Sequence, residues 1–369
     1  TDSFLKGFTF SGHTDFYFQS ASGRPGTGDF ATKGGNYGIN YRQFDTAHNS
    51  FTLAALQLNA IRKPTLESPW GVTLQFSAGK VADILALTEP AGRDTASKFL
   101  QQAYVSYAVP GSSATIDFGK FLSWIGYEGI ITPDQDLYSR SFLFYFCQPT
   151  YHTGFRVTSA LGTSGVTAAA YLVNGWNEFE DSNSGKSYGA TLSGTFGKTS
   201  ITGNYYGGNE GAPQVSSAYG PNGFASQGVT NVHMGDLVVV HQLNDKIKLA
   251  LNADYGSQSP VRRNSDGLSG KYYGIAGYVR AQFNPNFAAA IRYESVSDPQ
   301  GTRSGLRMGS GGAQFNSIAG TLDFTVGKDS LLRFEVRYDK SNRNAFNSSS
   351  GANGSSDRTT VLVSHVLKF

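Results

Sequence analysis

The sequence predicts an all-β fold, a transmembrane antiparallel up-and-down β-barrel of about sixteen strands. Charged residues make up 15% of the 369 residues, against about 25% in ordinary globular proteins. Aromatic residues are abundant, with 26 Phe and 20 Tyr. Apolar residues are spread singly along alternating segments, and no run approaches the ~18 apolar residues that a membrane-spanning helix needs. These features exclude a helical membrane protein and favour a chain that crosses a bilayer with strands.

The first and last alternating segments are the expected closing pair of the barrel. Within residues 359–369, Phe369 and Leu367 lie on a mostly apolar face and Ser364 lies on the other. An apolar strand end must be held by a neighbour. Residues 5–19, which alternate over a length that can cross a bilayer at a tilt, are the obvious partner.

The strands between them follow a rhythm of short turns and long loops, with Gly, Pro, Asn and Asp at the short turns. Residues 37–44 are extended but are interpreted as loop, because a spanning strand there would make short and long connections swap sides. The whole chain, 1–369, is expected to form a single barrel domain. The predicted strands are residues 5–19, 51–62, 70–79, 99–109, 114–121, 151–161, 166–173, 188–196, 200–207, 232–243, 246–255, 272–283, 287–295, 315–326, 331–339 and 359–369.

The alternation also assigns the face of each side chain. An arginine on the lipid face of a barrel costs about 2 to 4 kcal/mol at the bilayer midplane, so the charged face of each strand is expected to point into the lumen. The lumen is then polar and wet, with cations and acids interleaved. The predicted pore-lining residues are His13, Asp15, Lys248, Asp254, Arg280, Arg292, Glu294, Asp323, Arg333, Glu335, Arg337 and Asp339.

The third long loop, residues 122–149, contains an aromatic run at 142–146 that is too apolar for a loop left in water. We expect this loop to fold inward against the barrel wall. It would bring Glu128, Asp134, Asp136 and Arg140 into the channel. The alternative, that the acids are ordinary solvated loop residues, stays equally open.

Motifs for catalysis, metal binding or nucleic-acid binding are weak. His13 and Asp15 are neighbours on one strand face, but no serine is placed to complete a triad. The six histidines show no metal-ligand spacing, and the calcium-loop-like start at Asp181 has Leu192 where a bidentate Glu belongs. The single cysteine, Cys147, forbids an internal disulfide framework. A net charge of +3 without a block of Lys and Arg does not favour nucleic acid. We therefore expect no enzyme activity, metal or cofactor.

A soluble β-sandwich, propeller or solenoid would show the same alternation along each strand. Three features favour the membrane barrel instead: the scarcity of charge, the aromatic residues at strand ends, and the absence of an internal repeat of fixed period.

Five short motifs between residues 119 and 177 carry a resemblance to a known family. They are Gly119-Lys120-Phe121, Ile125-Gly126-Tyr127-Glu128, Tyr138-Ser139-Arg140-Ser141, Gln148-Pro149-Thr150-Tyr151-His152-Thr153-Gly154 and Asn174-Gly175-Trp176-Asn177. These motifs resemble the OmpL-like family of outer-membrane β-barrel porins. The resemblance implies a porin-like fold in the bacterial outer membrane, and Phe369 resembles the assembly signal that the outer-membrane assembly machinery reads. The strand count resembles that of sixteen-stranded general porins, in which the corresponding third loop narrows the pore. This likeness implies that the pore constriction is formed by Glu128, Asp134, Asp136 and Arg140.

Three function classes remain. The leading one is a water-filled channel for passive diffusion of small hydrophilic solutes and ions, with a weak anion preference because lumen acids only partly cancel the cations. The others are a scaffold or receptor barrel plugged by its loops or threaded by a partner protein, and an outer-membrane hydrolase. The expected partners are outer-membrane lipid, solutes and the assembly machinery, and a homo-oligomer stays open. Because the chain starts at Thr1 without an apolar leader, we expect a signal peptide to have been removed.

Overall fold

The computed structural model describes most of the chain. The described residues are 7–33, 35, 37–65, 67–88, 96–181, 183–213, 224–260, 269–306 and 312–369.

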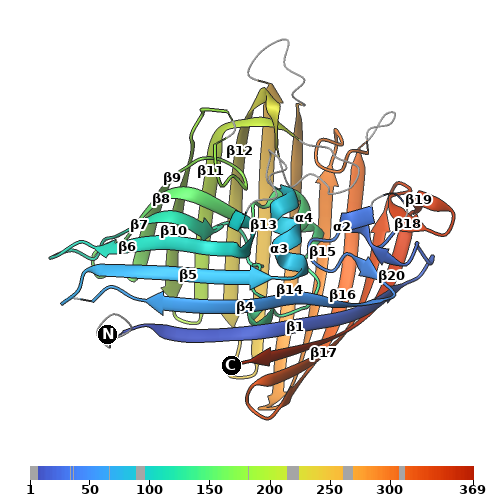
Figure 1. The fold of residues 1–369 in the computed structure, drawn as a ribbon, viewed down its shortest axis with the longest axis horizontal. Helices are drawn as coiled ribbons and strands as arrows, with labels where there is room; N and C mark the ends of the chain where they lie inside the picture. Colours follow the sequence, from blue (N-terminus) through green and yellow to red (C-terminus); the bar gives the residue numbers. More distant parts are fainter. Residues whose placement is uncertain are drawn as a thin grey trace.

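Sixteen antiparallel strands form one closed barrel, in which each strand pairs with its neighbour in chain order and the last pairs with the first (Figure 1). This confirms the predicted fold class. The strands are β1 (Thr9–Ala21), β4 (Ser50–Arg62), β5 (Trp70–Ala78), β6 (Leu100–Ala108), β7 (Thr115–Leu122), β8 (Tyr151–Ala160), β9 (Val166–Val173), β10 (Ser187–Phe196), β11 (Thr199–Pro213), β12 (Phe224–Gln242), β13 (Ile247–Pro260), β14 (Gly270–Asn284), β15 (Phe287–Asp298), β16 (Ala313–Val326), β17 (Ser330–Ser341) and β20 (Asp357–Lys368).

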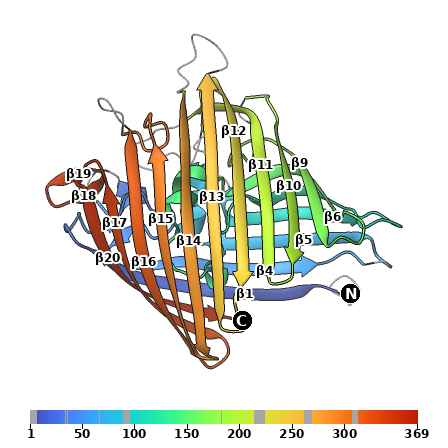
Figure 2. The same ribbon diagram turned by 180° about the vertical axis from the view of Figure 1, so that it is seen from behind.

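Most predicted strand bounds lie within three residues of those in the structure. β1 begins at Thr9, whereas the predicted strand begins at residue 5, which lies outside the described residues. On one wall β11, β12 and β13 run further toward the long loops (Figure 2). β12 begins at Phe224, whereas the sequence predicts residue 232. The added residues are mostly Gly and polar residues, with only Phe224 and Val229 as large apolar side chains, so no apolar alternation marks them.

The closing pair of strands is confirmed and is tightest at Phe369. The backbone N of Gly12 donates to the carbonyl O of Phe369 at 2.7 Å, and the N of Phe369 donates to the O of Gly12 at 3.0 Å. The Phe369 ring lies over Gly12, where an added Cβ would come within 2.5 Å of Cε2. This position therefore needs glycine because of close approach rather than backbone conformation.

The two faces of each strand separate as the alternation predicts, and β17 shows it most clearly. Phe334, Val336 and Tyr338 are exposed on the outer surface, whereas Arg333, Glu335, Arg337 and Asp339 are buried inside. The outer surface is rich in exposed large apolar side chains throughout the barrel. It therefore has the chemistry of a lipid-facing surface.

The long loops carry the remaining elements, and Figure 1 shows helices α3 and α4 within the outline of the barrel. Residues 37–44 contribute no barrel strand, as predicted. Helix α3 was not predicted, although Val81, Ile84 and Leu85 give it an apolar face at helical spacing. Within the described residues, no helix is long and apolar enough to span a membrane. The elements are β2 (Gly28–Asp29), α2 (Phe30–Lys33), β3 (Ala47–His48), α3 (Lys80–Thr88), η1 (Ala96–Phe99), η2 (Thr132–Asp134), α4 (Phe142–Cys147), β18 (Phe346–Ser348) and β19 (Gly351–Ser355).

Candidate functional site: the third long loop and the inner wall

The third long loop folds into the barrel, as predicted, and its aromatic run forms helix α4. Ser141 caps the helix, since its Oγ accepts a hydrogen bond from the backbone N of Phe144 at 2.9 Å. Glu128, from the other arm of the loop, accepts from the N of Ser141 at 2.7 Å and from its Oγ at 2.6 Å. All six residues of α4 are buried. The aromatic run is thus interior packing and not a lid in water.

An aromatic cluster holds α4 against the barrel wall and the other loops. Phe142 and Phe146 pack on Phe315 of β16, with ring centroids 5.2 and 4.7 Å apart. Tyr41 of the first long loop lies 5.6 Å from Phe146, and Phe346 of β18 lies 6.2 Å from Phe142. Aromatic pairs at these separations stabilise each other beyond the area they bury.

Ion pairs join the same loop to the charged wall. Arg292 of β15 places Nη1 2.7 Å from Oε1 of Glu128 and donates to the carbonyl O of Ser139 at 2.6 Å. Glu294 lies 3.4 Å from both Arg292 and Arg337. The structure therefore brings the predicted constriction acid Glu128 into direct contact with predicted wall residues.

Arg140 shapes the loop instead of facing an open lumen. Its guanidinium donates to three carbonyl oxygens of the same loop: those of Gly129 at 2.8 Å, Ile130 at 2.7 Å and Tyr138 at 2.5 Å. Its own carbonyl O accepts from Arg337 at 2.5 Å. Arg140 is thus a positioning residue that ties both arms of the loop together.

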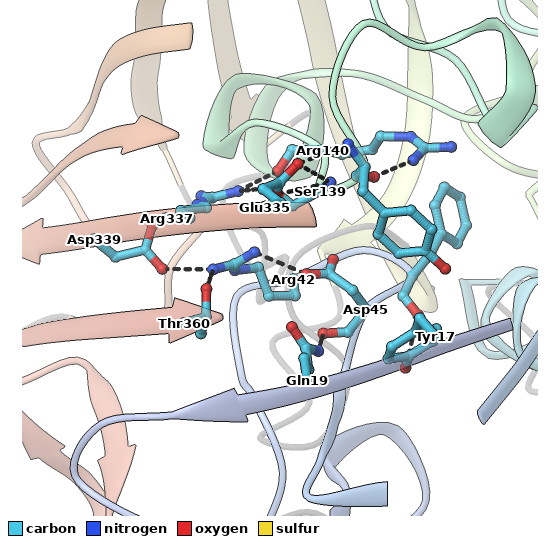
Figure 3. A network of polar contacts seen from close by, with 12 residues as sticks. Tyr17, Gln19, Arg42, Asp45, Ser139, Arg140, Glu335, Arg337, Asp339 and Thr360 are labelled. Carbon is cyan, nitrogen blue, oxygen red and sulfur yellow. Dashed lines mark hydrogen bonds and ion pairs between the residues drawn. The ribbon is translucent and has the colours of Figure 1, made fainter. Parts of the chain in front are cut away.

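The loop segment just before α4 is also held by acids from two other strands. Glu335 of β17 accepts from the backbone N of Tyr138 at 2.7 Å and of Ser139 at 3.2 Å. Asp15 of β1 accepts from the hydroxyl of Tyr138 at 3.1 Å. Figure 3 shows Ser139, Arg140, Glu335 and Arg337 gathered at this contact.

The first long loop enters the network through Arg42, which the sequence analysis did not single out. Arg42 pairs with Asp45 of its own loop at 2.8 Å and with Asp339 of β17 at 3.1 Å, and it donates to Thr360 at 2.9 Å (Figure 3). Arg358 of β20 also pairs with Asp339, at 2.8 Å. The only sequence signal is a loop that mixes aromatic residues with charges of both signs.

A second group of charges lies toward the short turns. Asp136 of the third long loop pairs with Lys248 at 2.8 Å and lies 3.8 Å from Arg280. Asp323 pairs with Arg280 and with Arg333, both at 2.8 Å. This group contains one predicted constriction residue and four predicted wall residues.

Three further predicted residues, Asp134, His13 and Asp254, lie outside these two groups of ion pairs. Asp134 is exposed and lines a cavity of about 220 Å³ together with Lys328 and Lys368. His13 is buried. Asp254 accepts from Nε2 of Gln148 at 2.8 Å.

The structure differs from the expected wet wall where the third long loop covers it. Arg292, Glu294, Glu335, Arg337 and Asp339 face the interior, yet each is no more than 2% exposed. Loop groups replace water as their partners. Glu128 and backbone groups of the third long loop contact the first four, and Arg42 of the first long loop contacts Asp339.

Burial also sets the acid–base behaviour of groups in the loops. Burial raises the pKa of the Cys147 thiol well above its ordinary value, so the thiolate is disfavoured. Burial likewise raises the pKa of the Asp45 carboxyl, although the Arg42 guanidinium beside it acts in the opposite direction. Within the part of the chain that the structure describes, no group of three or more His, Cys, Asp or Glu is placed to hold a metal ion.

Comparisons with known proteins agree with this geometry. Among solved structures, an anion-selective porin from Comamonas acidovorans is 10% identical, with a TM-score of 0.60, and the match covers 98% of this chain and 99% of the other. The outer membrane channel DcaP of Acinetobacter baumannii is 12% identical, with a TM-score of 0.61 and coverage of 98% and 97%. The trimer form of OmpT, an outer membrane protein of Vibrio cholerae, is 7% identical, with a TM-score of 0.62 and coverage of 98% and 99%.

These structures share the fold of the chain, and a search of curated proteins finds no match. A family model described as "Putative beta-barrel porin-2, OmpL-like" matches residues 7–369. The family is one of outer-membrane barrels, which confirms the resemblance carried by the short motifs. The chain belongs to the OmpL-like beta-barrel porin-2 family.

Proposed function

We propose that this protein is a bacterial outer-membrane porin that lets small hydrophilic solutes and ions diffuse passively, with the third long loop as its constriction. The observation that carries the proposal is the inward loop itself. Glu128, Asp136 and Arg140 lie inside a closed sixteen-stranded barrel, where wall cations pair with the two acids and Arg337 donates to the carbonyl O of Arg140. Barrels of this strand number enclose more space than their own side chains fill.

Water-exposed charge supports a weak preference for anions. In two interior ion pairs beside the third long loop the cation is more exposed than its acid: Lys248 and Asp136 (32% and 7% of the side chain), and Arg280 and Asp323 (23% and 3%). A permeating ion therefore meets more positive than negative side-chain surface. The buried pairs around Arg292 contribute little, since each charge there is neutralised at close range.

Planar bilayers test the channel. Purified protein added to a bilayer should produce discrete conductance steps, and the same protein unfolded by heat should produce none. In a salt gradient the zero-current potential should have the sign of a modest anion preference. Stable insertion without any conductance would reject the proposal.

One observation favours a second candidate, a barrel plugged by its own loops. The aromatic cluster around α4 and the dry charges of β15 and β17 seal part of the cross-section. A plugged barrel would insert into the bilayer without conducting, and it would begin to conduct when the third long loop is released from the wall.

The proposal contains no catalytic step. The trimer form of the similar OmpT structure makes a homo-oligomer a reasonable further proposal.

A further inference from the structure

The inner wall of the barrel has two chemically different halves. Inward-facing side chains on β15 and β17 include many buried charges, as at Arg292 and Glu335, beside apolar residues such as Ala290. Inward-facing side chains from β4 to β11 are mostly amides and hydroxyls, and many keep partial contact with water, as at Asn59, Gln102 and Thr202. The division follows the third long loop, because α4 packs against β13 to β16.

We call the inner wall from β4 to β11 the neutral wall. A row of three amides and one serine runs from β1 onto its first strands. Ser11, Asn59, Gln75 and Gln102 lie directly opposite one another on β1, β4, β5 and β6. Each bonds to the next: Asn59 Nδ2 to Ser11 Oγ at 3.1 Å, Gln75 Nε2 to Asn59 Oδ1 at 3.1 Å, and Gln102 Nε2 to Gln75 Oε1 at 3.0 Å. The ladder fixes uncharged donors and acceptors along the wall.

Hydroxyl groups continue the neutral wall on β10 and β11. Ser193 and Thr202 lie 2.8 Å apart between their Oγ atoms, and Thr191 donates to Asn204 at 2.7 Å. Hydroxyl pairs of this kind can exchange their hydrogen bonds with those of a passing solute, because each oxygen both donates and accepts.

A closed ion pair interrupts the neutral wall at β7 and β8. Arg156 Nη2 lies 2.5 Å from Asp117 Oδ2, so the two charges neutralise each other. The guanidinium also stands over the rings of Phe121 at 4.9 Å and Tyr104 at 5.5 Å. Tyr104 is only partly buried and adds an apolar ring face beside hydroxyl groups such as that of Ser106.

We propose that solutes pass along this neutral wall, and that it favours uncharged, hydroxyl-rich solutes such as neutral sugars over ions of similar size. The inference rests on the proposed channel function. A neutral sugar offers hydroxyls to the amides and apolar C–H faces to Tyr104. An ion of that size would lose part of its hydration shell at this wall. The wall offers little in return, because its nearest charges, Arg156 and Asp117, are already paired with each other.

Two serines in one register row provide a matched test of the path. Ser193 on β10 and Ser317 on β16 both face inward and belong to the same row of paired positions, but Ser193 is partly exposed and Ser317 is buried. Ser193→Cys and Ser317→Cys are each made in a Cys147→Ser background and treated in bilayers with a bulky neutral methanethiosulfonate reagent.

Modification of the Ser193→Cys variant should reduce conductance, and the Ser317→Cys variant should keep its conductance. Block through Ser317→Cys alone would put the path on the charged wall and overturn the inference, while the channel function would stand. A parent protein that never conducts would overturn both.

Proteoliposome swelling tests the solute class. A neutral hexose should enter faster than the sugar acid and the amino sugar of the same carbon skeleton, and modification of Ser193→Cys should slow the hexose. Faster entry of either charged sugar would overturn the preference for neutral solutes, again without affecting the channel function.

Discussion

At the scale of single residues, close approach and burial decide which positions are fixed. Gly12 and Phe369 show this at the closing seam, where the ring of one covers the backbone of the other. The alternation of the last strand predicts its pairing with the first strand. It cannot predict this glycine, because the need for it arises only when the two strands are in register.

Replacing Gly12 by valine should destabilise the barrel by about 1 to 3 kcal/mol, the usual cost of overpacking. The new Cβ would meet the Phe369 ring and the backbone O of Gln57 at 2.6 Å. Urea unfolding in detergent, followed by heat-modifiable gel migration, measures the change. The control is Gly320→Val, since nothing lies within 4 Å of a Cβ added there. Equal unfolding midpoints for the two variants would contradict the prediction.

At the scale of the strand, adjacent residues should respond in opposite ways. Val336→Arg puts a charge on the outer surface of β17 and should impair insertion by about 2 to 4 kcal/mol. Arg337→Leu should leave insertion intact but weaken the packing of the loops, because Glu294 and Asp339 each lose one cation partner and the carbonyl O of Arg140 loses its donor. Insertion yield into vesicles and limited proteolysis separate the two effects. Similar insertion yields for both variants would reverse the facing of β17.

At the scale of the third long loop, the ion pair of Arg292 with Glu128 should be essential for docking. Arg292→Gln removes the cation that pairs with the buried Glu128, a loss of about 3 to 5 kcal/mol where one partner of a buried pair is removed. The free Cys147 reports the result, since it is fully buried and should react with a maleimide only when the loop leaves the wall.

Arg292→Gln should accelerate this labelling and raise the conductance, and adding Glu128→Gln should recover part of the slow labelling. Lys340→Gln, at an exposed position on β17, is the control. Labelling of the Arg292→Gln variant at the rate of the control would show that the aromatic cluster alone docks the loop.

The strands and the loops differ in how far the sequence predicts them. The two faces of β17 can be predicted from the sequence, because every second side chain faces lipid and must be apolar. This rule depends only on neighbouring positions in the strand. The pairing of Arg42 with Asp339 joins positions 297 residues apart, and no local pattern contains it. Helix α3 was missed for a related reason: its short apolar face has meaning only beside Phe44 and Phe144. The aromatic run in the same loop predicts that Glu128 and Asp136 lie inside the barrel. It does not predict that their partners on the wall, such as Arg292, are buried away from water.

At the scale of the whole molecule, two groups of charges are expected to have different roles. The pairs around Arg292, Arg337 and Asp339 are buried and hold the loops, so changing them should alter whether the barrel conducts. The pairs at Lys248 and Asp136 are partly wet and lie toward the short turns. These should alter which ion is preferred.

Lys248→Gln should therefore reduce the anion preference, and Asp136→Asn should increase it, because each removes one member of a partly exposed pair. The zero-current potential in a salt gradient measures both shifts. They should shrink as the salt concentration rises, since the screening length falls from about 10 Å at 0.1 M to about 3 Å at 1 M. Arg333→Gln, on a buried cation nearby, is the comparison variant and should shift the potential less. If both variants keep the zero-current potential of the parent protein at low salt, Lys248 and Asp136 lie outside the path of the ions. The neutral wall from β4 to β11 would then carry the whole flow.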